Sequence, residues 1–131
     1  MPWGLDAIEH MFVRQDGGVD DDFCYVTTVG RRTGRPHEIE IWYAVDGDGR
    51  ILYLLSGGRD RSDWVRNLTA EPSVTVRLRD HTYDATARFP EPGSAEDTRA
   101  RTLVFEKYQP RYGGSLERWR DTALPVALDV A

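Results

Sequence analysis

Hydrophobic and polar side chains alternate along several short stretches of the chain, which is the pattern of half-buried β-strands. Stretches 23–29 and 37–45 are rich in β-branched and aromatic residues. The run D-G-D-G at 46–49 has the composition of a hairpin turn, and a further apolar stretch follows it at 50–55. These patterns predict three strands in the first half of the chain.

Helical spacing of apolar positions appears in three places. The first is 4–13, which is followed by a glycine- and aspartate-rich loop at 16–22. The second begins after Asp60 or Ser62 and runs to about residue 70. The third covers 94–108 and opens with S-A-E-D, which resembles a capping box.

Alternating patterns at 74–78 and 83–89 predict two more strands, and 124–130 predicts a last one. In the first two of these, the positions expected on the inner face are Val74, Val76, Leu78, Tyr83, Ala85, Ala87 and Phe89. Six strands joined mainly by hairpins predict a mainly β (α+β) domain spanning 1–131, because closure of an antiparallel sheet into a small barrel removes its exposed edges. The chain length suits one domain.

Charge narrows the possible functions. The formal net charge is −5, whereas a general nucleic-acid binder needs a broad basic face. Two short glycine-containing loops at 30–36 and 56–61 nevertheless carry five arginines: Arg31, Arg32, Arg35, Arg59 and Arg61. Glycines let a ligand approach the backbone, and guanidinium groups suit phosphate and carboxylate. The two loops predict a site for an anionic small molecule, with solvated turns as the alternative.

Other common site types find no support in the sequence. Cys24 is the single cysteine, so neither an intrachain disulfide nor a cysteine-based zinc site is possible. His10, His37 and His81 lack metal-ligand spacing, so no metal site is expected. No stretch approaches the about 20 apolar residues of a membrane span, and we expect a cytoplasmic protein.

Three motifs in order resemble the deazaflavin-dependent nitroreductase family. They are T-T-V-G-R-R-T-G-R at 27–35, L-S-G-G at 55–58 and W-V-R-N-L-T-A-E-P-S-V at 64–74. The resemblance is strong over 23–79 and looser in the tail. It implies a split β-barrel related to pyridoxamine-phosphate oxidases, a homodimer, and a hydride transfer from the deazaflavin coenzyme F-420 to a small acceptor such as a nitroaromatic, quinone or enone.

The resemblance also implies cofactor-binding residues. In the first loop these are Arg31, Arg32, Thr33 and Arg35, expected at the cofactor's phosphate or oligoglutamate tail. Along the deazaflavin ring, or bracing it from the helix, they are Ser56, Gly57, Gly58, Trp64 and Asn67. Arg59 and Arg61 of the second loop complete the set. Many members carry a lysine where this chain has Gly57, and Arg59 is the candidate to substitute for it.

Simpler interpretations remain open for several of these residues. Residues 56–58 also suit an ordinary strand-to-helix turn, and Trp64 also suits a core position. Tyr108 and Tyr112 are the candidate proton donors, but residues four apart on a helix also form packing pairs. Trp3, Phe12 and Trp42 are candidates for stacking on a ring or covering a dimer seam.

Glu38 and Glu40 depart from the family pattern, which carries small or apolar residues after the first loop. Two carboxylates beside an anionic cofactor would repel it unless arginines neutralise them. They are outward strand residues in the simpler interpretation, and dimer or substrate contacts in the other. Two alternative functions follow: a reductase of the same fold that uses flavin mononucleotide (FMN), and a non-catalytic carrier of a cofactor or apolar ligand.

Overall fold

The computed structural model describes residues 22–46 and 48–131. The expected helix at 4–13 and nearly all of the loop at 16–22 lie outside these residues. Within them, no helix is long and apolar enough to cross a bilayer.

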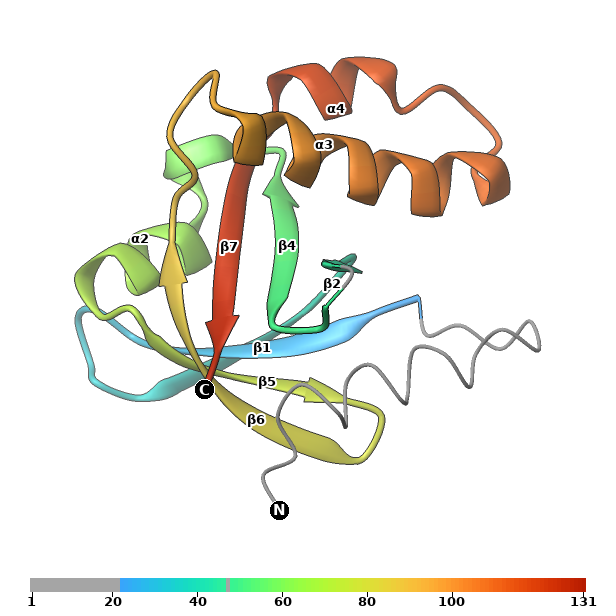
Figure 1. Ribbon diagram of the computed structural model, residues 1–131. Coiled ribbons are helices and arrows are strands. Elements are labelled where there is room, and N and C mark those ends of the chain that lie inside the picture. The colour runs from blue at the N-terminus through green and yellow to red at the C-terminus, as the bar shows by residue number, and fades with distance from the viewer. Residues whose placement is uncertain (1–21, 47) are drawn as a thin grey trace.

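The described residues form one antiparallel sheet with the strand order β2-β1-β5-β6-β7-β4-β3. Its seven strands are β1 (Cys24–Val29), β2 (Pro36–Ile41), β3 (Ala44–Val45), β4 (Ile51–Ser56), β5 (Ser73–Leu78), β6 (His81–Arg88) and β7 (Leu124–Val130). Figure 1 shows β4 and β7 crossing β1 and β5 at a steep angle, so the sheet is strongly curled. β2 and β3 are its two edges, and the result is a half-barrel that stays open between them.

The expectation of six strands is wrong, because the predicted strand 37–45 is broken in two at Trp42 and Tyr43. β2 pairs with β1, whereas β3 pairs with β4 at the other end of the sheet. At the break, the backbone N–H of Tyr43 donates to the hydroxyl of Tyr108 at 3.0 Å, and the Tyr43 carbonyl accepts from Lys107 Nζ at 2.9 Å. These side chains satisfy the backbone of Tyr43 in place of a neighbouring strand.

Three helices and two 3₁₀ turns complete the described chain. They are η2 (Arg59–Arg61), α2 (Asp63–Ala70), α3 (Ala95–Tyr108), η3 (Gln109–Arg111) and α4 (Glu117–Thr122). The predicted cap of α3 is confirmed: Ser94 Oγ accepts from the Asp97 backbone N–H at 3.1 Å. α4 was not predicted, since it is short, has no side-chain cap and follows the glycine pair at 113–114.

Apolar side chains form two clusters, one on each face of the curled sheet. Leu52 and Leu54 of β4 face the inner cluster, together with Leu68 of α2, whereas Tyr53 and Leu55 face the outer cluster beneath α3 and α4. β4 is therefore buried on both faces. The inner positions expected for β5 and β6 are buried except Phe89, which is 40% exposed because β6 ends one residue earlier.

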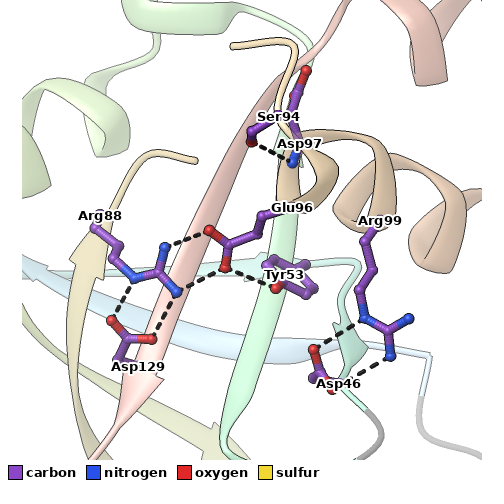
Figure 2. Close-up of polar contacts among 8 residues, drawn as sticks. All are labelled: Asp46, Tyr53, Arg88, Ser94, Glu96, Asp97, Arg99 and Asp129. Carbon is purple, nitrogen blue, oxygen red and sulfur yellow. Dashed lines mark hydrogen bonds and ion pairs between the residues drawn. The ribbon is translucent and has the colours of Figure 1, made fainter. Parts of the chain in front are cut away.

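A polar network fastens the first turn of α3 to the sheet (Figure 2). Arg88 of β6 donates to both carboxylate oxygens of Glu96 at 2.6 and 2.7 Å, and to those of Asp129 on β7 at 2.6 and 3.1 Å. The Tyr53 hydroxyl donates to Glu96 at 2.9 Å. The bonds from Arg88 are the main cause that lowers the pKa of Glu96. This network sets the height of α3 over β4, and thereby the position of the segment that follows α3.

Candidate functional site

The first arginine loop is a tight turn between β1 and β2. The Gly30 N–H donates to the Arg35 carbonyl at 2.7 Å, and the Gly34 N–H donates to the Gly30 carbonyl at 2.8 Å. A Cβ on Gly30 would lie 2.7 Å from His37 Nε2, and Gly34 has a φ of +73°. The backbone conformation at Gly34 therefore favours glycine, whereas a side chain at Gly30 would have to displace the His37 ring.

Arg31 connects this loop to α2. Its backbone N–H and its guanidinium donate to Asn67 Oδ1 at 3.2 and 2.9 Å, and the guanidinium also contacts Asp63 at 3.3 Å. Asn67 is buried and donates from Nδ2 to Thr28 Oγ1 at 3.1 Å. The motif residues Arg31 and Asn67 thus act on each other directly, and Asn67 has a structural task whatever ligand is bound.

The other polar groups of this loop face solvent. Arg32 and Arg35 are exposed, and their guanidinium groups form no ion pair within the described part of the chain. Thr33 Oγ1 accepts from the Arg35 N–H at 3.2 Å. Arg31, Arg32 and Thr33 line a hollow of about 250 Å³, in which Asp63 is the one acidic group. Guanidinium groups with this freedom are available to an anionic ligand.

The second loop connects β4 to α2. Ser56 is buried, and its hydroxyl hydrogen-bonds to the Arg59 carbonyl and to Ser62 Oγ, both at 3.0 Å. A Cβ on Gly58 would lie 2.4 Å from Ser62 Oγ, so a side chain here would displace that hydroxyl from its contact with Ser56. Ser62 is the N-cap residue of α2, but its side chain is used in this contact and makes no capping bond.

The remaining predicted residues around this loop point in different directions. Arg59 donates to the carbonyl of Thr122 at the end of α4, and Arg61 is exposed. Trp64 is half-buried and packs against the inner cluster, in agreement with the simpler interpretation that it is a core residue. None of these three lines the hollow beside Arg31, so the predicted residues do not all meet in one cavity.

A large cleft of the described chain includes Gly57 of the second loop in its lining. It has a volume of about 710 Å³ and is lined by Gly57 together with Phe23, Glu40, Ile41, Trp42, Tyr112, Ser115, Leu116, Arg118, Trp119 and Thr122. Trp42 is at the centre of its aromatic residues: its ring stands edge-on to Trp119 at 5.6 Å and to Tyr112 at 6.0 Å. Such a cleft suits a flat aromatic ligand.

The two candidate tyrosines have different surroundings. Tyr108 is buried, stacks on Trp42 at 4.3 Å, and its hydroxyl lies 2.7 and 3.0 Å from the carbonyls of Asp22 and Tyr43. Because it also accepts from the Tyr43 N–H, this hydroxyl is fully used by the backbone. Tyr112 is 48% exposed and lines the large cleft, and its hydroxyl makes no hydrogen bond to a described residue.

Glu38 and Glu40 both lie on the outward face of β2. Glu38 pairs with Arg77 at 3.5 Å. Glu40 accepts a hydrogen bond from the Tyr25 hydroxyl at 2.6 Å and lines the large cleft. Neither carboxylate lines the hollow beside Arg31. The repulsion of an anionic cofactor that the sequence suggested is therefore not expected from these two residues in that hollow.

Sequence reasoning missed Arg118 and Trp119. Both belong to α4, which carries no clear helical pattern and no cap. Trp42 was considered only as one of several aromatic residues, because its position at the break between β2 and β3 was not foreseen. No group of three His, Cys, Asp or Glu side chains suited to a metal ion occurs in residues 22–46 and 48–131.

Comparison with known proteins shows the family of this chain. Residues 10–130 match the family model of the F420H(2)-dependent quinone reductase. The chain is 31% identical over 104 residues to the F420H(2)-dependent quinone reductase Rv1261c of Mycobacterium tuberculosis, and to a protein of Mycobacterium bovis called a putative F420H(2)-dependent quinone reductase. Each alignment covers 79% of this chain and 68% of the relative.

Solved structures show the same fold. The F420-H2 dependent reductase FDR-A has a TM-score of 0.63 at 25% identity, covering 84% of this chain and 94% of that one. The conserved protein Rv2991 of Mycobacterium tuberculosis has a TM-score of 0.70 at 22% identity, covering 95% and 79%. With the family model matching nearly the whole chain, this protein belongs to the F420H(2)-dependent quinone reductase family and is an oxidoreductase.

Proposed function

We propose that this protein uses reduced coenzyme F-420 to reduce quinones in the cleft beside Trp42. The observation that carries the proposal is a cleft with aromatic residues that includes Gly57 of the 56–58 loop, together with a hollow lined by Arg31 and Arg32 of the 30–36 loop. A deazaflavin has a flat ring at one end and a phosphate with an anionic tail at the other, so its two chemical halves match the two sites.

Both loops are held at the beginning of α2, which supports one ligand extending between them. Arg31 contacts Asp63 in the first turn of α2, and Ser56 contacts Ser62 immediately before it. In this proposal Arg31, Arg32 and Arg35 bind the phosphate or tail. The ring lies beside Gly57, where Trp119 is the neighbouring side chain: a Cβ on Gly57 would lie 3.5 Å from Trp119 Nε1.

The donor set fits such a cofactor. Arg32 and Arg35 have no acidic partner among the described residues, and guanidinium groups bind phosphate and carboxylate through paired hydrogen bonds. The cleft offers Trp42 and Trp119 as apolar surface for a ring. Reduced F-420 supplies the hydride itself, so the protein has only to bind, orient and exclude water.

The chain's own residues have distinct roles in this reaction. We assign Tyr112, which lines the cleft and whose hydroxyl has no hydrogen-bond partner among the described residues, as a proton donor to the reduced acceptor. Tyr108 has a positioning role, because its ring supports Trp42 and its hydroxyl holds the backbone of Tyr43. Asn67 holds Arg31 in place, and Trp64 braces α2 against the inner cluster.

A nitroaromatic or an enone is a further acceptor of the same chemical type, since each is a flat, electron-poor group that accepts a hydride. The comparisons name quinones and give no support to the FMN alternative. We also propose a homodimer, supported by the exposed apolar rings of Phe23 and Phe89, each 40% exposed. Sedimentation of the purified protein tests this, and a monomer would contradict it. A cytoplasmic location stays a prediction.

The function is tested by titrating the protein with oxidised F-420 and, separately, with FMN, following the fluorescence of each. Reduced F-420 and 1,4-naphthoquinone are then supplied, and absorbance records the oxidation of the cofactor. We expect micromolar or tighter binding of F-420 alone and turnover of the quinone. Binding of neither cofactor would favour the carrier, and tight binding without turnover of any acceptor would contradict a reductase.

A further inference from the structure

The segment from α3 to α4 contains five arginines, and the described structure uses four of them in ion pairs. These are Arg99 with Asp46, Arg101 with Asp97, Arg111 with Asp22 and Arg120 with Asp121. The fifth, Arg118, makes no ion pair or side-chain hydrogen bond with any described residue. Arg118 is exposed, so its guanidinium is accessible to a ligand in the cleft that it lines.

Arg118 lines the large cleft together with Trp42, Tyr112 and Trp119. The other charged residue of the cleft lining is Glu40 on β2, which already accepts a hydrogen bond from Tyr25 at 2.6 Å. Among the described residues, Arg118 is therefore the one cationic group in a lining that also contains four aromatic side chains. Hydrogen bonds to a charged group next to apolar surface are stronger than the same bonds in water.

We propose that Arg118 binds the oxygen of the acceptor on which negative charge develops during reduction. This inference rests on the proposed function. Hydride transfer adds two electrons and one hydrogen to the quinone, oxidises the reduced cofactor, and leaves a hydroquinone monoanion. One proton, from Tyr112 or water, then completes the hydroquinone. Arg118 keeps its own proton throughout, because a guanidinium is not deprotonated in proteins, and it stabilises the oxyanion through hydrogen bonds.

The same contact sets substrate preference. An acceptor whose reducible ring already carries an anionic oxygen should bind more tightly than a neutral one of the same size. Glu40, which also lines the cleft, opposes that preference through its negative charge. Loss of the Arg118 charge should therefore weaken binding of an anionic acceptor, and loss of the Glu40 charge should strengthen it.

A binding experiment without cofactor tests the inference directly. The anion of 2-hydroxy-1,4-naphthoquinone and neutral 1,4-naphthoquinone are titrated into the protein, and quenching of tryptophan fluorescence is followed, since Trp42 and Trp119 line the cleft. Arg118→Ala should weaken binding of the anion about tenfold or more and leave the neutral quinone nearly unchanged. Arg118→Lys should recover part of the loss, because lysine keeps the charge but not the planar fork.

Arg120→Ala is the matched control, since Arg120 lies on the same helix, pairs with Asp121 and does not line the cleft. It should bind both quinones as the wild type does. Glu40→Gln should bind the anion more tightly. Circular dichroism and thermal unfolding of each variant check that α4 is retained.

Three outcomes would overturn the inference. The first is that the wild type binds the anion no more tightly than the neutral quinone, and the second is that Arg118→Ala keeps the preference for the anion. The third is that Arg118→Ala loses affinity for F-420 and not for the anionic quinone. Steady-state kinetics then separate this inference from the proposed function. If the wild type reduces no quinone, the function fails, while the binding experiment still decides whether Arg118 holds an oxyanion.

Discussion

Arg31 and Asn67 form a double contact that joins the arginine loop to α2. The backbone N–H and the guanidinium of Arg31 both donate to the same oxygen, Asn67 Oδ1, at 3.2 and 2.9 Å. Two residues from separate sequence motifs, 36 positions apart, therefore form one structural unit. Its orientation decides which face of the loop remains available to a ligand.

Removing the amide of Asn67 should destabilise the fold. Asn67→Ala leaves the Arg31 N–H and the buried Thr28 hydroxyl without their partner. We expect the free energy of unfolding to fall by about 1–3 kcal/mol. Urea denaturation measures it. Asn67→Asp keeps the oxygen that Arg31 uses and should lose less, and equal losses for both variants would contradict this account.

The exposed arginines of the same loop should affect ligand binding and leave stability unchanged. Arg32→Ala and Arg35→Ala remove guanidinium groups without described ion pairs, so we expect little change in unfolding and a loss of F-420 affinity of about tenfold or more each. Fluorescence titration measures the affinity. Arg50→Ala, at the opposite end of β4 from Ser56, is the control. Unchanged affinity in both loop variants would show that this loop is only a solvated turn.

Removing the hydroxyl of Tyr108 should lower stability, whereas removing that of Tyr112 should lower activity. Tyr108→Phe removes the partner of the Tyr43 backbone, and we expect about 1–3 kcal/mol of destabilisation. Tyr112→Phe should unfold as the wild type does and reduce the turnover number with a quinone. Thermal unfolding and steady-state kinetics on the same samples decide. A stable Tyr108→Phe variant with lost turnover would reverse the two roles.

Acid should weaken the network at the first turn of α3. Hydrogen bonds from Arg88 lower the pKa of Glu96 in the folded protein, so the folded state prefers the ionised carboxylate. Its stabilising contribution is present above the ordinary glutamate pKa of about 4.3 and is lost as the pH falls through the lower folded value. Between about pH 5 and 3, the unfolding free energy of the wild type should therefore decrease more steeply than that of Glu96→Gln. Glu106→Gln, exposed on the same helix, should follow the wild type.

Cys24 should be inert in the folded protein. It is fully buried in β1, and burial raises the pKa of its thiol to about 12. Because the thiolate is the reactive form, a thiol reagent at pH 8 should label Cys24 only as the fold opens. Labelling rates with and without denaturant measure this. Rapid labelling of native protein would show that β1 opens locally.

The sequence by itself determined the elements with a strong local pattern. β1, β5, β6 and β7 lie within two residues of the stretches that alternation or β-branched and aromatic composition predicted as strands, and Ser94 caps α3 as its S-A-E-D pattern indicated. These elements depend on side-chain period and on bonds between near neighbours, which a single sequence displays. The two arginine loops could also be found from the sequence, because the glycine and arginine residues that define them are identified by residue type alone.

Only the tertiary structure decided the break at Tyr43 and the cleft around Trp42. The Tyr43 backbone bonds to a hydroxyl 65 residues away, on the last residue of α3, and no local pattern encodes that distance. α4 brings Arg118 and Trp119 to the same cleft although its own sequence carries no cap. The chemistry of each loop was therefore visible in the sequence, whereas the site between them depends on packing contacts that form only when the sheet curls.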